Sequence, residues 1–235
     1  MATILQDASN AINTWNDVRN NTAATINYFN EGAYFSINRS DFATWHTKWL
    51  ALNKPSNFKI HAYLGLQNDT TSVNFSLCLY SVDSNTDKKK VSNHENEYLT
   101  NLKFSNYHKA TLHNPIFNPE LVSNSDLDPL EALQRSTQWT LSKDTWLGQQ
   151  TDMAQILVIP FKDLNTLFTN QNIDTLICQP ALSQEESSFN MDLIIWGHSN
   201  EFGIMAKYPQ DLIQPVPPYS ATNPVSNFQL LQFSL

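Results

Sequence analysis

The sequence predicts an α+β fold built from two tandem copies of one unit, each with the order helix, strand, helix, strand and hairpin, related by a pseudo-twofold axis. Two observations predict it. Apolar residues recur at helical spacing in some stretches and alternate in others, and the stretch 34–83 has a degenerate copy at 156–199. We assign residues 1–125 to the first α+β repeat and residues 126–235 to the second, which ends in an extended, Pro-rich arm.

The two copies align with one change of register. Asp41 and Asp163 lie 122 positions apart, whereas Leu66 and Leu182 lie 116 positions apart. The difference of six residues falls between these pairs, where the helix of the second copy is the shorter one. Apolar alternation makes any two hairpins look alike, so chance similarity is the alternative, but the shared order of elements favours internal duplication.

The first copy is predicted to begin with a helix at 4–29 that breaks near Asn20, followed by a short strand at 33–37. Ser40 is expected to cap the next helix, because a serine side chain can accept a hydrogen bond from an early backbone amide. Pro55 ends that helix. Its apolar face carries Phe42, Trp45, Trp49 and Leu52.

A hairpin follows, with strands at 58–66 and 73–79 that both alternate apolar and polar residues. The alternation predicts that one side is buried and that His61 and Tyr63 lie on the outward side. An exposed histidine is the ordinary case at such a position.

The middle of the chain, 84–125, is polar, with a predicted strand at 98–104. Asp128 and Pro129 predict the start of a long helix, because aspartate is a good cap and proline fits the first helical position. The second copy then repeats strand, helix and hairpin. The end of the chain, from Tyr208 on, is predicted to be an extended strap or an exposed arm, because its prolines cannot join a central strand.

Composition excludes several classes of function. The 235 residues, 41% of them hydrophobic, can bury a sizeable core, and the net charge of −8 argues against a nucleic-acid partner. No glycine motif of a phosphate-binding loop occurs, so no nucleotide cofactor is expected. Cys78 and Cys178 lie in apolar, strand-like runs, which favours buried free thiols over a disulfide.

No apolar run approaches the ~20 residues that span a bilayer. The first ten residues lack the basic region and long apolar run of a secretory signal. We therefore expect a cytoplasmic protein with no membrane partner, and export by a non-classical route is the alternative.

The candidate chemical groups do not form a recognised motif. His94, Glu95 and Glu97 offer metal ligands, with His108 and His113 downstream, but the spacing is not that of a zinc helix, and we expect a solvated polar loop and no metal.

Asp192 with Glu185 and Glu186 could act as a carboxylate pair, but the glutamates lie at the predicted hairpin tip, where solvated turn residues are the better interpretation. His46, His61 and His198 lack an evident nucleophile partner, so we assign no catalytic residue, while a triad assembled from distant segments stays open.

Aromatic residues are the better binding candidates. Tryptophans at helical spacing are typical of a core, whereas three residues late in strands are expected on the surface. The predicted binding residues are Tyr63, Tyr80 and Trp196, with Pro217, Pro218 and Tyr219 in the tail.

A resemblance can be stated on these residues. The strand IHAYLGL, the hairpin through SLCLYSVDS, and the closing PPY with NP shortly after resemble a set of small bacterial α+β proteins of no assigned function, most of which hold a single copy. The similarity covers 58–83 and 208–227, and the cysteines expected beside the two prolines are replaced by Val216 and Tyr219. The resemblance implies a fold and no chemistry.

The sequence therefore favours a non-enzymatic interaction or assembly protein that contacts a like or unlike protein through its tail and its hairpin edges. A carbohydrate- or small-ligand-binding module that uses exposed aromatics is the first alternative. A hydrolase whose site is assembled from distant segments is the second.

Overall fold

The computed structural model of the chain describes residues 3–29, 34–68, 75–107, 127–170, 173–185, 188–199, 203–210, 214–216 and 224–233. The helices are α1 (Ile4–Val18), α2 (Thr22–Thr25), α3 (Arg39–Ala51), α4 (Ser84–Asp87), α5 (Glu95–Asn101), α6 (Pro129–Gln149) and α7 (Phe161–Asn170). The strands are β1 (Phe35–Asn38), β2 (Lys59–Asn68), β3 (Phe75–Asp83), β4 (Lys103–Asn106), β5 (Ile156–Pro160), β6 (Thr175–Glu185), β7 (Ser188–Ser199), β8 (Gly203–Gln210) and β9 (Gln214–Val216). Short 3₁₀ turns are η1 (Ile26–Tyr28), η2 (Val91–Asn93), η4 (Val225–Asn227) and η5 (Gln229–Gln232).

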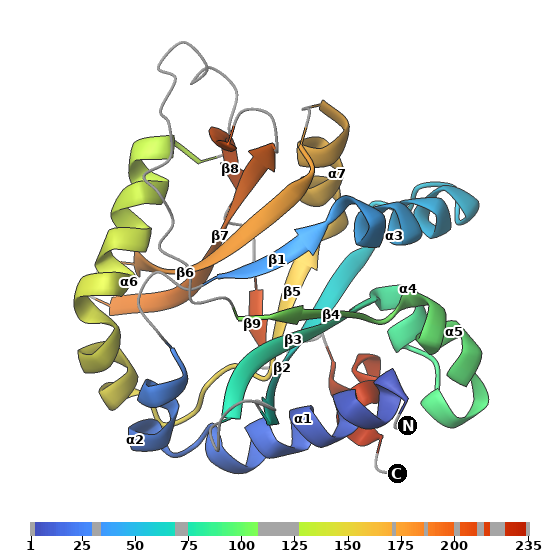
Figure 1. Cartoon of the computed structure of the whole chain (residues 1–235), viewed down its shortest axis with the longest axis horizontal. Coiled ribbons are helices and arrows are strands. Elements are labelled where there is room, and N and C mark those ends of the chain that lie inside the picture. Colours follow the sequence, from blue (N-terminus) through green and yellow to red (C-terminus); the bar gives the residue numbers. More distant parts are fainter. Residues whose placement is uncertain are drawn as a thin grey trace.

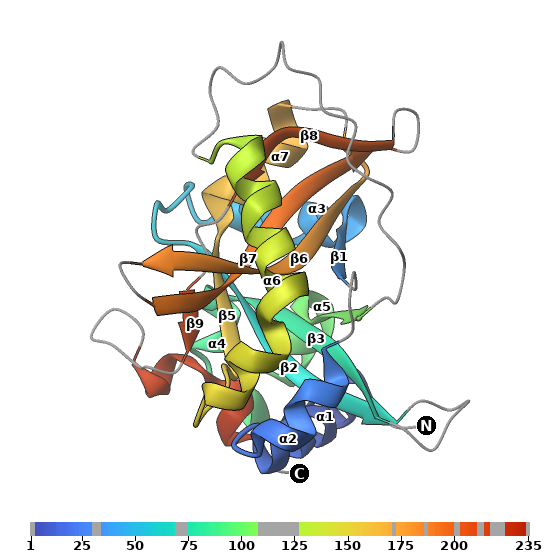
Figure 2. The same ribbon diagram turned by 90° about the vertical axis from the view of Figure 1, so that its left-hand side faces the viewer.

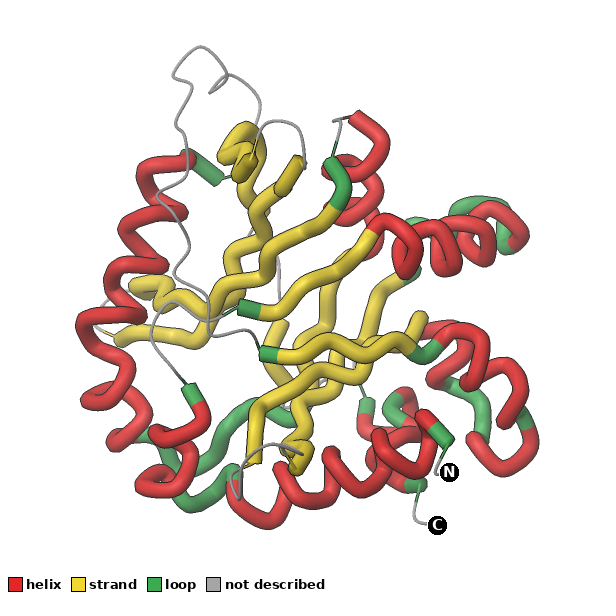
Figure 3. The backbone as a smooth tube through the Cα atoms, viewed as in Figure 1, coloured by secondary structure: helices red, strands yellow, loops and turns green. Residues whose placement is uncertain are grey.

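The described strands form two antiparallel sheets, which confirms the α+β class (Figure 1). One sheet has the order β1-β6-β7-β8 and the other has the order β4-β3-β2-β5-β9. The sheets meet where edge strands β1 and β4 lie beside each other, as the tube in Figure 3 shows. There the backbone N–H of Ser36 donates to the hydroxyl of Ser105 at 2.9 Å, so a side chain satisfies an edge amide that has no strand partner.

Each sheet includes strands from both halves of the chain: β1 joins the four-stranded sheet, and β5 and β9 join the five-stranded sheet. Strand β1 pairs with β6, where Asn38 faces Thr175, and β5 pairs with β2, where Pro160 faces Lys59. Asn38 at the end of β1 and Pro160 at the end of β5 lie 122 positions apart. Lys59 at the start of β2 and Thr175 at the start of β6 lie 116 positions apart. These are the two offsets of the sequence alignment. The predicted boundary between residues 125 and 126 lies outside the described residues.

The main core fills the space between the sheets. It joins the inward faces of β2 and β6 to the aromatic residues of α3 and α7. Helix α1 covers the outer face of β2, and α6 covers the outer face of β6 and β7 (Figures 1 and 2). Three tryptophans fasten helices and loops to distant backbone, because each indole N–H donates to a carbonyl. The pairs are Trp15 with Ala154, Trp45 with Asn101 and Trp146 with Phe189.

The long helices begin where local chemistry predicts, with one correction. Asp128 caps α6 by accepting from the backbone N–H of Leu130 at 2.7 Å, and Pro129 occupies the first helical position. Helix α3 begins at Arg39 and its cap is Asn38, so the prediction of Ser40 was wrong by two residues. Asn38 and Asp41 form a reciprocal capping box, which satisfies two amides that a serine at position 40 would leave open.

The first hairpin departs from the prediction, because both sides of β2 are buried. Helix α1 and the C-terminal segment cover the side that was expected to face solvent. The middle segment also differs. Residues 95–101 form helix α5, and the strand that was expected at 98–104 is limited to 103–106.

The described residues from 214 on pack against the rest of the chain. Residues 214–216 form β9, which pairs with β5. Phe228 and Leu230 are buried against α1 and β2, and the carbonyl of Phe233 accepts from the hydroxyl of Ser9 at 2.9 Å. The described residues of this stretch therefore pack on the molecule and do not form an exposed arm, while 211–213 and 217–223 lie outside the described residues. Among the described residues, no helix is long and apolar enough to cross a membrane.

Gly65 lies where α1 packs closely against β2. A Cβ there would lie 3.0 Å from the Cβ of Ala11 and 3.2 Å from the Sγ of Cys78. We expect Gly65→Ala to lower the free energy of unfolding by about 1–3 kcal/mol, because α1 must move away from the sheet. Gly148→Ala is the control: its Cβ would meet open space near the end of α6, and it should raise stability by about 0.5–1 kcal/mol. Urea unfolding measures both, and equal effects would contradict the close approach.

Candidate functional site

A buried polar cluster lies on the outer face of the β4-β3-β2-β5-β9 sheet. It consists of His61 and Tyr63 from β2, Asp87 from α4 and Tyr98 from α5. The Nδ1 of His61 lies 2.6 Å from Oδ2 of Asp87, and the hydroxyl of Tyr63 donates to the same oxygen. The hydroxyl of Tyr98 lies 3.3 Å from the other carboxylate oxygen. The carbonyl of Lys89 lies nearer to the Tyr98 hydroxyl, at 2.9 Å, so Tyr98 donates there, and His61 and Tyr63 are the close partners of the fully buried Asp87.

The electrostatics of the cluster fix the direction of its hydrogen bonds. Burial, followed by the charge of Asp87, raises the pKa of both Tyr63 and Tyr98 well above the ordinary tyrosine value. Both phenols therefore keep their protons and act as donors. The distance of 2.6 Å between Nδ1 of His61 and Oδ2 of Asp87 is that of a short hydrogen bond between the two side chains.

This arrangement is that of a histidine oriented by a carboxylate, which in many hydrolases prepares the imidazole as a base. Here it is closed. The ring of Phe228 lies 4.7 Å from that of His61, and the backbone of Leu230 donates to the Tyr63 hydroxyl. The expectation that His61 is exposed was wrong, because the C-terminal segment covers it. In this structure the cluster joins β2, α4, α5 and the chain end.

An ion cluster borders the buried one. Glu97 accepts from Lys48 at 2.6 Å and from Lys89 at 2.8 Å, and Lys48 also reaches Asp83 at 3.2 Å. Partial burial acts to raise the pKa of Glu97, but the hydrogen bonds and charges of the two lysines outweigh it and lower the pKa to about 2. The expected solvated loop at 94–97 is instead the first turn of α5, with an ionised carboxylate at its centre.

The aromatic residues predicted to bind ligands are not accessible where they are described. Tyr63, Tyr80 and Trp196 are all buried, at 0%, 1% and 3% exposure. Tyr80 packs with α1, and Trp196 packs with α6, because both sheets are covered on their outer faces. The expectation of exposure was therefore wrong. Pro217, Pro218 and Tyr219 lie outside the described residues.

The other sequence candidates are dispersed. His108, His113 and Glu186 lie outside the described residues, and within the described ranges no group of three His, Cys, Asp or Glu side chains could hold a metal ion. His46 stacks on Phe42 at 5.2 Å. Cys78 and Cys178 are buried free thiols, as predicted, and burial raises the pKa of each to about 12.

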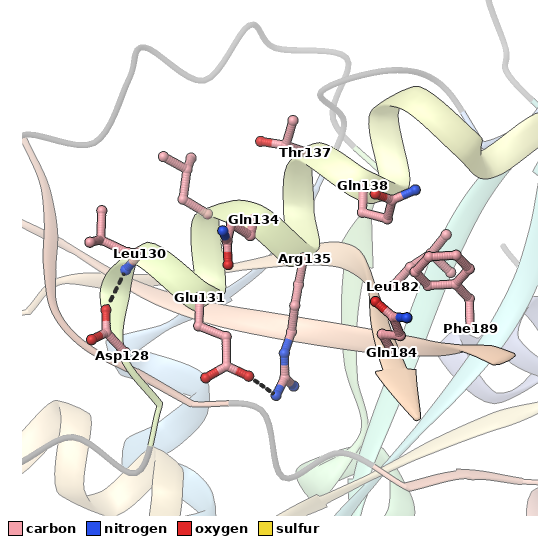
Figure 4. Close-up of a pocket in the computed structure, with 11 residues that line it drawn as sticks. Asp128, Leu130, Glu131, Gln134, Arg135, Thr137, Gln138, Leu182, Gln184 and Phe189 are labelled. Atoms are coloured by element: carbon pink, nitrogen blue, oxygen red, sulfur yellow. Dashed lines mark hydrogen bonds and ion pairs between the residues drawn. The ribbon is translucent and has the colours of Figure 1, made fainter. Parts of the chain in front are cut away.

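An open groove of about 920 Å³ lies between α6 and the end of the β6-β7 hairpin (Figure 4). Its apolar lining is Leu130 and Leu133 from the helix, with Leu182 and Phe189 from the strands. Its polar lining is Asp128, Glu131, Gln134, Arg135, Thr137, Gln138 and Gln184. A groove of this size, with mixed lining, can receive a small ligand or a protruding side-chain cluster.

The groove is acidic. Arg135 donates to Glu131 at 2.6 Å and to Asp192 at 2.9 Å, and the figure shows the first pair inside the groove (Figure 4). Asp128 adds a third carboxylate at the start of the helix. The groove lining thus has two carboxylates and one guanidinium, a formal charge of −1, with the buried carboxylate of Asp192 behind it. Asp192, which the sequence paired with Glu185 and Glu186, is thus an ion-pair partner of Arg135.

The outward leucines of α6 were the signal that the sequence analysis missed. Leu130 and Leu141 are 65% and 77% exposed, the largest fractions among the large apolar side chains of the described residues. Leu130 lies nine residues before the buried Trp139, so the two point to opposite sides of the helix at 100° per residue. The inward face is occupied by Ala132, Ser136, Trp139, Lys143 and Trp146.

Comparison with protein-family models, with curated proteins and with solved structures finds no match for this chain. The resemblance to small bacterial α+β proteins therefore stays a prediction.

Tyr63→Phe tests the buried cluster. Removing one O–H donor leaves Asp87 short of a partner in a site without water, so we expect a loss of about 1–3 kcal/mol in the free energy of unfolding. Tyr80→Phe is the matched control, since the Tyr80 hydroxyl makes no hydrogen bond with another described residue, and it should change stability by less than about 0.5 kcal/mol. Equal losses in chemical unfolding would show that the hydroxyl of Tyr63 contributes nothing special.

Glu97 makes stability depend on pH. Its pKa is about 2 in the folded protein and about 4.5 in an unperturbed chain, so the unfolded state binds more protons between these values. The stabilisation is present above pH 4.5 and is lost as the pH falls toward 2. Wild type should therefore lose more unfolding free energy than Glu97→Gln across this window. Glu95→Gln, on the same helix, should follow wild type, and parallel curves for all three proteins would contradict the ion cluster.

Proposed function

We propose that this chain is a non-enzymatic interaction and assembly protein, and that its contact surface is the outward side of α6 with the adjoining groove. The observation that carries the proposal is the exposure of Leu130 and Leu141 on one helix. Eleven residues separate them, which places them within about 20° of each other around the helix and about 16 Å apart along it. Gln134 and Thr137 lie between them on the same side, so this strip of α6 has an exposed leucine at each end and borders the groove.

Burial of this strip against a protein would be favourable. Covering an exposed leucine side chain contributes about 1.5–3 kcal/mol, and α6 presents two, beside the apolar lining of the groove. Single exposed leucines are common on soluble proteins, but two on one face next to an open groove are typical of an interaction surface. The helix and the hairpin that form the groove belong to regular elements, so the surface is pre-organised.

The contacts of the histidine and of the aromatic side chains support the same proposal. The histidine with a carboxylate partner is covered, and the tyrosines and the tryptophan considered for sugar stacking pack inside. Trp49, a partly exposed tryptophan, contacts Phe161 at 5.4 Å on one side and holds Lys54 at 5.7 Å from its ring centre. These contacts favour protein binding over sugar binding.

We also propose that the two halves arose by tandem duplication. The support is the reciprocal pairing of β1 with β6 and of β5 with β2, in matched registers. The backbone N–H of Arg39 donates to the carbonyl of Asp174, and that of Phe161 donates to the carbonyl of Phe58, so even the flanking hydrogen bonds correspond. A fused dimer of single-copy proteins would have this arrangement.

The contact surface can be tested by a photo-crosslinker placed at position 141. We expect irradiation in the cells that make the protein to yield a discrete adduct of higher mass, because a partner covers this side of α6. The same group at position 99, a leucine that is 38% exposed on α5, is the matched control and should give no such adduct. Absence of an adduct at 141, or equal adducts at both positions, would contradict the proposed surface.

A further inference from the structure

We propose that the groove beside α6 receives the projecting end of α3 from a second copy of this chain, in head-to-tail assembly. We call residues 49–57, which end α3 and turn toward β2, the α3 tip. The inference rests on the proposed function, because it names the partner of the same surface. Its argument combines the shape of the tip, its charge and its place in the molecule.

The α3 tip is an exposed and partly apolar protrusion. Seven of the eight residues at 50–57 are exposed. Leu50 and Leu52 are 44% and 39% exposed, and because they are two residues apart they face solvent on different sides of the helix end. The end of α3 projects from the body of the molecule on the right of Figure 1. Leu52, at the very end of the helix beside Lys54, can enter an open groove whose apolar lining is Leu130, Leu133, Leu182 and Phe189.

Hydrogen bonds within the α3 tip hold its backbone in one conformation. The backbone N–H of Lys54 donates to the carbonyl of Trp49 at 2.9 Å, and the Trp49 indole donates to the carbonyl of Pro55 at 3.2 Å. Asn53 and Lys54 both adopt left-handed backbone conformations, with φ of 60° and 55°. For lysine this conformation is costly, so the surrounding contacts must impose it. A fixed protrusion loses little conformational freedom when it binds, which favours its use as a contact.

The charges of the tip and the groove are opposite. No aspartate or glutamate occurs from Phe42 to Asn68, and Lys54 is exposed on the tip. The groove carries Asp128 and Glu131, with Asp192 behind them, against one arginine. Lys54 would therefore face carboxylates while Leu52 enters the apolar part of the groove. Groove against groove would instead oppose two acidic surfaces, which disfavours a symmetric pair.

The two surfaces lie on opposite sides of the molecule. Figure 1 shows α6 at the left edge and the end of α3 at the right, so one chain cannot fill its own groove. Contact between unlike surfaces leaves a free tip and a free groove at the ends of every pair, and the assembly continues as a chain or closes as a ring. The contact is small, so we expect it to be weak and concentration-dependent.

Complementation between two variants tests the inference. The tip variant carries Leu52→Ser and Lys54→Glu, and the groove variant carries Leu130→Ser and Glu131→Lys. Sedimentation of wild type from low micromolar to submillimolar concentration should show a mass that rises beyond a dimer. Each variant alone should stay monomeric, with a dissociation constant raised at least tenfold. Their equimolar mixture should form one-to-one pairs and nothing larger, because one intact tip meets one intact groove.

A control variant with Lys90→Glu and Leu99→Ser changes an exposed lysine and an exposed leucine away from both surfaces and should sediment as wild type. Thermal unfolding checks that all variants fold. A wild type that is monomeric throughout, a tip variant that still assembles, or a mixture that stays monomeric would overturn the inference. Monomeric wild type with an adduct to an unlike protein at position 141 would leave the interaction function standing, whereas no adduct and no assembly would overturn both.

Discussion

The exchange of β1 and β5 between the halves is the constraint on which the described structure depends. Each sheet includes strands from both halves, so neither half completes its sheet alone. Strands β1 and β5 both contribute side chains to the main core, where α3 and α7 pack against each other. The register of a strand pair fixes which face of each strand is buried. The matched registers of β1 with β6 and of β5 with β2 therefore turn the apolar faces of β2 and β6 toward the same core.

The halves differ most after their hairpins. Residues 84–102 insert α4 and α5 between β3 and β4, whereas β7 passes to β8 without a described helix. The insertion supplies Asp87 and Tyr98 to the buried cluster and Glu97 to the ion cluster. A buried carboxylate is tolerated only when its oxygens are satisfied, and here the close partners of Asp87 are His61 and Tyr63, both from β2. The cluster therefore ties the inserted helices and the chain end to β2.

Helix α6 keeps two leucines, Leu130 and Leu141, on the protein surface. Its inner face has room for small or polar residues such as Ala132 and Ser136, and Lys143 lies there with its ammonium 2.7 Å from the carboxylate of Asp144. The leucines at 130 and 141 are thus not needed for the core. A helix that turns leucines outward while a lysine lies inward is consistent with a surface shaped by a contact as well as by folding.

The sequence by itself determined the elements whose signals are local: the cap and start of α6, the strand periods and the buried cysteines. It did not reveal that β2 is covered on both sides, because alternation of His61 and Tyr63 with apolar residues has the same pattern whether the polar side meets water or a buried carboxylate. Only the tertiary structure brought Asp87, Tyr98 and Phe228 onto that face. Only it placed the hairpin end beside α6 to make a groove, since partners distant in the chain decide what each face contacts.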